Sequence, residues 1–137
     1  MRTAVLRLLR ASAATAVVLV VGCGDNPTAP GIEPQVTNLS DAFSYQVSSI
    51  QDFTGSYSYT WQNTGTVAKI THASDAGAAG SATLTVRDAE GTQVYSGQLA
   101  TSGEPQSDPA GVAGAWTITI VYTDYSNSQV NFAVLKQ

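Results

Sequence analysis

The chain is predicted to be all-β, folded as a single antiparallel β-sandwich of about seven to eight strands. From about residue 39, apolar and polar residues alternate with a period of two, as in strands that bury one face. No part of this region has the 3.6-residue periodicity of a helix. Short runs rich in Gly, Asn, Asp and Ser separate the alternating segments, as turns do in β-proteins.

The first 22 residues are interpreted as an export signal. Arg2, Arg7 and Arg10 form a basic start, and an apolar segment runs from Ala11 to Val21. That segment is about half the ~20 residues of a membrane-spanning helix, so it is not predicted to remain as one. Removing residues 1–22 from the 137 leaves a chain the size of one domain.

The only cysteine follows this segment, in Val20-Val21-Gly22-Cys23. The four residues resemble the lipobox of bacterial lipoproteins. The resemblance implies cleavage before Cys23, a diacylglyceryl group on its thiol and an acylated amino terminus. Gly24 in the next position implies the outer membrane or cell surface of a bacterium rather than its inner membrane. The alternative is an ordinary cleaved signal with a chance cysteine, which would leave an exported thiol without a partner in its chain.

A spacer is predicted between the lipidated cysteine and the domain. Residues 23–38 contain Pro27, Pro30 and Pro34 and few apolar side chains, and proline-rich segments form semi-rigid, extended linkers. The predicted organisation is therefore a signal (1–22), a lipidated tether (23–38) and a β-sandwich (39–137).

Charge excludes one class of partner. After the signal is removed, Lys69, Arg87 and Lys136 remain against ten acidic residues, a net charge of −7. Affinity for nucleic acid comes largely from Lys and Arg on phosphates, so nucleic-acid binding is excluded. Anionic headgroups would repel this surface as well, so membrane attachment is expected through the lipid on Cys23 alone.

The strands and turns are expected in this order. Alternating segments are centred on residues 43–47, 57–61, 68–70, 82–86, 94–95, 116–122 and 130–134. Asn63–Gly65, Asp88–Gly91 and Asp124–Ser128 are predicted to be hairpin loops. Residues 73–80 and 100–113 are predicted to be longer connections. This arrangement is typical of jelly-roll sandwiches, with the immunoglobulin or fibronectin type as the alternative.

Two segments carry a resemblance to a known fold family. Ala82–Asp88 with Gly91, and Gly114–Ile120 before a last hairpin and strand, resemble CUB-like and bacterial pre-peptidase jelly-roll domains over about residues 55–137. The resemblance implies a jelly roll.

Candidate catalytic and metal-binding residues are few. His72 is the only histidine, with Ser74 and Asp75 close in sequence, but no Gly-x-Ser-x-Gly elbow is present and no catalytic residue is predicted. No cofactor is expected. Calcium is kept as an option, with loop residues Asp75, Asp108 and Asp124 as ligand candidates, although no ligand-spaced calcium loop occurs.

Tyrosines are the candidates for ligand binding. Tyr57, Tyr59 and Trp61 share one face of a predicted strand, which fits either a core face or a platform for stacking sugars. Tyr125, in a predicted loop, is the candidate expected to be exposed. The chain is therefore predicted to be a non-enzymatic envelope lipoprotein whose β-sandwich binds or supports a polysaccharide or another envelope protein. The alternative is a carbohydrate-binding module that uses exposed Tyr or Trp, with or without calcium.

Overall fold

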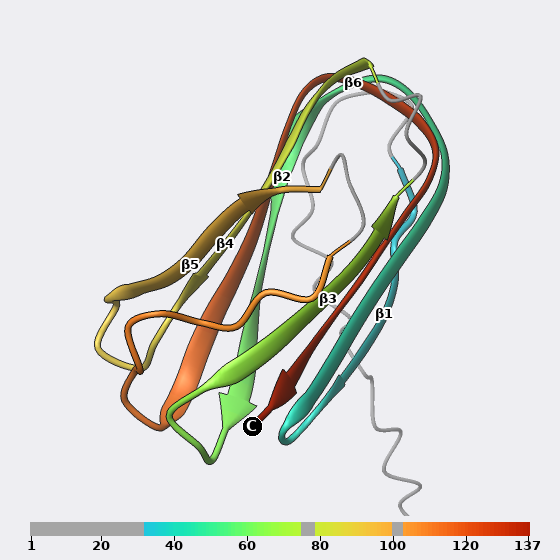
Figure 1. Ribbon diagram of the computed structural model, residues 1–137. Helices are drawn as coiled ribbons and strands as arrows, with labels where there is room; N and C mark the ends of the chain where they lie inside the picture. Colours follow the sequence, from blue (N-terminus) through green and yellow to red (C-terminus); the bar gives the residue numbers. More distant parts are fainter. Residues whose placement is uncertain (1–31, 75–78, 100–102) are drawn as a thin grey trace, which may run out of the picture.

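A computed structural model describes residues 32–74, 79–99 and 103–137 of the chain. Their strands form one antiparallel sheet and no helix occurs among them, so the all-β prediction is confirmed (Figure 1). The described strands are β1 (Gln35–Leu39), β2 (Ala42–Asn63), β3 (Ala68–Ser74), β4 (Ala79–Arg87), β5 (Gln93–Gln98) and β6 (Gly114–Lys136). Their order in the sheet is β1-β2-β6-β4-β5, and β3 pairs with β6.

The sheet is folded over because its two longest strands bend together. Residues 42–50 of β2 pair with residues 127–135 of β6, and residues 53–63 of β2 pair with residues 114–125 of β6. Figure 1 shows both strands curving at the same end of the molecule. The bend divides the sheet into two facing halves. Layer A contains β1, β3 and the halves of β2 and β6 that pair with them, and layer B contains β4, β5 and the other halves.

Polar residues with left-handed backbone form the bend. Ser49 and Asp52 in β2 and Asp124 in β6 have φ values of 58°, 44° and 44°, and the register shifts twice between Ile50 and Gly55. Such irregularities bend a strand and increase its twist. Asp52 N–H donates to Ser126 Oγ at 2.9 Å, and Asp124 N–H donates to Thr54 Oγ1 at 2.9 Å. Side-chain oxygens thus satisfy backbone groups where the ladder is interrupted.

Aromatic side chains fill the space between the layers. Phe43 of layer A lies 5.4 Å from Tyr59 of layer B, measured between ring centroids. The hydroxyls of Tyr45 and Tyr122, also from opposite layers, are 3.0 Å apart. Alternate residues of β4 and β6 complete the core, where their side chains are fully or almost fully buried: Ala82, Leu84, Val86, Trp116, Ile118, Ile120, Val130, Phe132 and Val134. The period-two pattern therefore assigned the buried faces correctly.

Two predicted hairpins are wrong. Asp124–Ser128 lies inside β6, because the strand bends there through a left-handed Asp124 and does not reverse. Asn63–Gly65 is a turn, but the strands on either side of it do not pair. It carries the chain from layer B to layer A, where β3 pairs with β6. Because β2 and β6 bend without ending, the predicted segments 43–47 and 57–61 belong to one strand, and so do 116–122 and 130–134. Six strands are therefore described instead of seven or eight.

The third predicted hairpin is confirmed. β4 and β5 pair through the turn at Asp88–Gly91, and Gly91 has the left-handed φ of 83° that favours glycine. Asp88 is buried, and its Oδ1 accepts hydrogen bonds from the N–H groups of Glu90 and Thr92 at 3.0 and 2.8 Å. Its Oδ2 accepts the N–H of Val112 at 3.0 Å, which ties the hairpin to the loop before β6.

Layer A has an additional segment at each of its two edges. At one edge this is β1, which begins before the predicted domain, and at the other it is a segment that pairs with β3. β1 pairs with residues 42–46 of β2, so the sheet begins at Gln35, within the segment predicted to be tether. On the far side of β3, residues 103–107 run alongside it. Ile70 N–H donates to Pro105 O at 2.8 Å, and His72 and Gly103 exchange two backbone hydrogen bonds. This segment covers the edge that β3 would otherwise leave open.

Candidate binding surface

The predicted aromatic stripe belongs to the core. Trp61 is fully buried, and its Nε1–H donates to Leu39 O at 3.1 Å. Tyr59 is half-buried against the rings of Phe43 and Tyr45. Tyr57 is also half-buried, and its hydroxyl donates to Ile32 O at 3.0 Å. Burial raises the pKa of both tyrosine hydroxyls above the ordinary value. Of the two interpretations of this stripe, the geometry favours the core face.

The expectation that Tyr125 is exposed is wrong. Its side chain is fully buried in β6, 5.4 Å from the ring of Tyr122, and its hydroxyl accepts a hydrogen bond from Asn127 Nδ2 at 2.9 Å. The error follows from the misplaced hairpin, because the bend of β6 turns this ring inward whereas a loop would have exposed it. The three candidate tyrosines therefore do not form a flat external platform.

The candidate calcium ligands are not gathered into one site among the described residues. Asp124 lies at the bend and accepts a hydrogen bond from Thr54 Oγ1 at 3.1 Å. Asp108 lies beside the start of β5, where its N–H donates to Val94 O at 2.7 Å. Asp75 falls outside the described residues, as does Cys23. No group of three or more His, Cys, Asp or Glu side chains suited to a metal occurs in the described part of the chain.

His72 lies on the inner face of β3 and is 7% exposed. Its Nδ1 is buried without a hydrogen-bond partner, and Gly103 lies against the other side of the ring. The side chain of Ser74 and all of Asp75 are outside the described residues. The imidazole is therefore a buried group of the core with an unpaired Nδ1.

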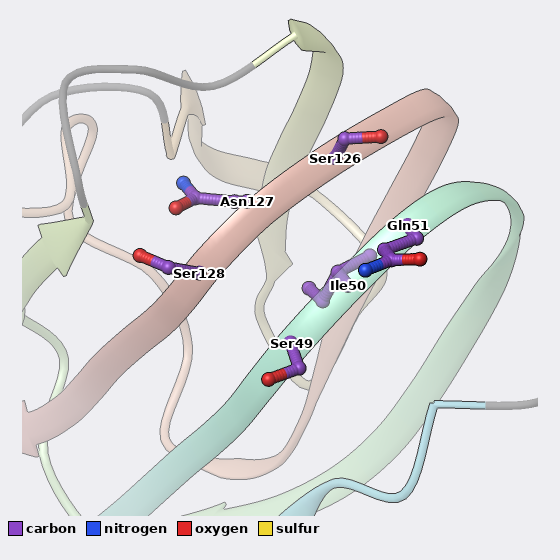
Figure 2. Close-up of a pocket in the computed structure, with 6 residues that line it drawn as sticks. All are labelled: Ser49, Ile50, Gln51, Ser126, Asn127 and Ser128. Atoms are coloured by element: carbon purple, nitrogen blue, oxygen red, sulfur yellow. The ribbon is translucent and has the colours of Figure 1, made fainter.

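A polar pocket of about 390 Å³ lies at the bend. Figure 2 shows its six lining residues on two neighbouring strands: Ser49, Ile50 and Gln51 on β2, and Ser126, Asn127 and Ser128 on β6. Sequence reasoning did not identify this pocket. The available signal was the break in alternation at Ser48-Ser49, which marks the first irregular residue of β2. One lining residue, Ser49, is among the left-handed residues that bend the strands, so the shape of the pocket follows from the bend.

The outer face of layer B carries a regular array of hydroxyl groups. The strand registers place its residues in three rows that each cross β2, β6, β4 and β5 in that order. We name this surface the hydroxyl face. Its rows are Ser56, Val121, Thr83 and Gln98; Ser58, Thr119, Thr85 and Ser96; and Thr60, Thr117, Arg87 and Gln93.

The spacing of the array follows from sheet geometry. Neighbours in a row lie ~4.8 Å apart and neighbours along a strand ~6.8 Å apart. The exception is on β5, where a register shift against β4 separates Gln93 from Ser96 by three residues. Hydrogen bonds link several of them within the face. The hydroxyls of Ser58 and Thr119 are 2.6 Å apart, and Gln98 Nε2 donates to Thr83 Oγ1 at 2.8 Å. Eight of the twelve side chains are Ser or Thr, which orders donors and acceptors on a lattice set by the backbone.

The hydroxyl face is almost uncharged, although the chain has ten acidic residues. Arg87 is its only charged residue, and the guanidinium donates to Gly91 O at 3.0 Å, at the β4–β5 turn. Val121 is 44% exposed in the first row. An exchange of protein–water hydrogen bonds for protein–partner bonds contributes only about 0.5–1.5 kcal/mol per bond, so such a face needs many contacts at once.

Comparison with known proteins adds no relative: no family model and no curated protein matches the chain. The described residues include no helix that is long and apolar enough to cross a membrane.

Proposed function

We propose that this chain is a non-enzymatic lipoprotein of the bacterial envelope, held by a lipid on Cys23, and that its β-domain binds an uncharged partner through the hydroxyl face. The observation that carries the binding role is the composition of that face. Its four strands present eight hydroxyls and one charged side chain, from a chain with net charge −4. Charged partners would find little to pair with there.

The same proposal takes the domain to be a β-sandwich of jelly-roll type. Three features support this. β2 and β6 each contribute to both layers, aromatic rings of the two layers are in contact, and residues 103–107 run beside β3 like a further short strand. Both layers then carry strands that are distant in sequence, as Greek-key connections produce.

The anchor predicts where the protein is found in the cell. The intact protein is expected in the membrane fraction, because two or more acyl chains hold stably in a bilayer where one does not. Gly24 after the cysteine favours the outer membrane. Cys23→Ser removes the acceptor of the lipid and is expected to move the protein to the soluble fraction. The measurement is immunoblotting of fractionated cells, with labelling by radioactive palmitate as the direct readout. A Cys23→Ser variant that stays with the membrane would contradict the anchor.

The binding role is tested with two matched variants of the full-length protein in a neutral detergent. Thr119→Lys places a charge in the middle row of the hydroxyl face. Thr71→Lys places the same charge on the outer face of layer A, at a residue that is half-buried like Thr119. The proposal expects the protein to bind at least one insoluble, uncharged surface, with binding lost in Thr119→Lys and kept in Thr71→Lys. Equal behaviour of the two variants would contradict a role for the hydroxyl face.

A further inference from the structure

The chemistry of the hydroxyl face narrows the kind of partner. The middle row, Ser58–Thr119–Thr85–Ser96, has a hydroxyl on each of four neighbouring strands. Each hydroxyl donates one hydrogen bond and accepts up to two, so it is both a donor and an acceptor, as water is. The hydroxyl oxygens of Ser58 and Thr119 are 2.6 Å apart, the separation of a short O–H···O hydrogen bond. The face is therefore a fixed pattern of water-like groups.

The regular spacing favours a rigid and periodic partner. A flexible chain in solution would have to be ordered on the face, and weak hydroxyl contacts do not offset that entropy easily. A solid is already ordered, so it loses no conformational entropy on binding, and it can contact all three rows simultaneously. Apart from Arg87 at the end of β4, the face residues of β2, β6 and β4 are Ser, Thr or Val, so a solid surface can approach most of the face closely.

The side chains also distinguish between solids. Sugars in crystalline polysaccharides present apolar ring faces, on which proteins stack exposed aromatic rings. The rings of Tyr57, Tyr59 and Trp61 lie on the opposite, inner face of layer B, and the hydroxyl face has no aromatic residue. What the face does offer is uncharged donors and acceptors with threonine methyl groups between them. That combination complements an uncharged lattice made only of hydrogen-bonded water.

We propose that the hydroxyl face binds ice, with Thr83, Thr85, Thr117 and Thr119 at the centre of contact. This rests on the proposed function of that face as a binding surface and names its occupant. A lipid-anchored domain of this kind would hold an ice crystal against the cell envelope. The scarcity of charge on the face, where Arg87 is the one charged residue, supports this occupant, because ions are excluded from the ice lattice.

The test is partition of the full-length protein into slowly grown ice, in a neutral detergent with a small dye as an excluded solute. The wild type and Thr71→Lys are expected to be enriched in the ice relative to the dye. Thr119→Lys is expected to lose at least about tenfold of that enrichment, equivalent to about 1.4 kcal/mol. Val121→Thr adds a hydroxyl to the first row and is expected to raise the enrichment. Circular dichroism and melting curves check that each variant is folded.

Each outcome decides the matter. Wild-type protein excluded from ice as fully as the dye overturns ice binding, and so does equal enrichment of Thr119→Lys and Thr71→Lys. The same proteins are also sedimented with crystalline cellulose, chitin and peptidoglycan sacculi. If the wild type is excluded from ice but sediments with a polysaccharide, and Thr119→Lys abolishes that sedimentation, ice binding is overturned. The hydroxyl face is then retained as a polysaccharide-binding site. If the wild type is excluded from ice and Thr119→Lys changes its sedimentation with none of the three solids, the proposed function of the hydroxyl face is overturned as well.

Discussion

Tyr45 and Tyr122 connect the two layers through a contact between buried hydroxyls. Both side chains are 1% exposed, and burial raises the pKa of each hydroxyl far above its ordinary value. Both groups therefore stay neutral in the folded protein, and each hydroxyl serves as the hydrogen-bond partner of the other at 3.0 Å. A buried polar group without its partner is costly, whereas removal of both groups of a pair is often tolerated.

This pair predicts a specific non-additivity. Tyr45→Phe and Tyr122→Phe should each lower the free energy of unfolding by about 1–3 kcal/mol, because each leaves the other hydroxyl buried and unpaired. The double variant should lose less than the sum of the two single losses. Urea unfolding of the four proteins measures this coupling. Strictly additive losses would show that the two hydroxyls do not depend on each other.

At the scale of the elements, the sequence predicted faces better than it predicted the ends of strands. Alternation identified the inner residues of β2, β4 and β6, because burial depends on a pattern repeated over many residues. It misread the bends, since Asp124–Ser128 has the composition of a hairpin loop and yet lies within one strand. A local polar run is compatible with both a reversal and a bulge, and only the pairing of β6 with β2 over its whole length decides between them.

The candidate site shows the same limit. The threonines of the hydroxyl face were visible as the polar half of each alternation. Their assembly into rows was not, because it depends on the sheet order β2-β6-β4-β5, which joins residues 56–60 to residues 93–98 across two intervening strands. Tyr125 was misassigned for a related reason, since its direction depends on the bend beside it. Non-local pairing therefore accounts for both the missed site and the incorrect one.

A substitution at Gly80 tests how closely β4 approaches β6 at the bend. Its φ is 73°, and a Cβ there would meet the backbone carbonyls of Thr123 and Asp124. Gly91 is the matched control, because its φ of 83° is similar but no atom lies within 4 Å of the position that a Cβ would take. Gly91→Ala is expected to cost about 1–2 kcal/mol from backbone conformation alone. Gly80→Ala should cost clearly more, since β4 must also move away from β6. Equal losses on urea unfolding would contradict a close approach at the bend.

For the whole molecule, two carboxylates close the end opposite the bend. The carboxylate of Asp41 accepts a hydrogen bond from the N–H of Thr64 at 2.7 Å and forms an ion pair with Lys136 at 3.2 Å. It therefore joins the β1–β2 turn to the crossing from layer B to layer A and to the last residues of β6. Asp88 joins the β4–β5 hairpin to the loop before β6. The bend holds the layers together at one end through covalent continuity of β2 and β6. At the other end the chain itself crosses between the layers at Asn63–Gly65, and Asp41 ties this crossing to the end of β6.

The pKa values of these two carboxyls predict how stability depends on pH. The backbone N–H of Thr64 lowers the pKa of Asp41 below its ordinary value of 3.8, against the effect of burial. Burial would raise the pKa of Asp88, but the N–H groups of Thr92, Val112 and Glu90 outweigh it and lower that pKa as well. Because both folded values are depressed, the unfolded chain binds more protons at acid pH. Their stabilisation is complete above the ordinary value and is lost as the pH falls through the folded values.

Urea unfolding at neutral pH and at about pH 2 should therefore show a loss of stability in acid that shrinks in Asp41→Asn and in Asp88→Asn. Both variants should also be less stable at neutral pH. In Asp88→Asn, an amide that keeps one oxygen must face three backbone N–H donors, so its NH₂ group opposes one of them. Asp108→Asn controls for the loss of one negative charge, because that residue is exposed. An acid loss that is the same in Asp41→Asn, Asp88→Asn and Asp108→Asn would mean that neither Asp41 nor Asp88 accounts for the pH dependence of stability.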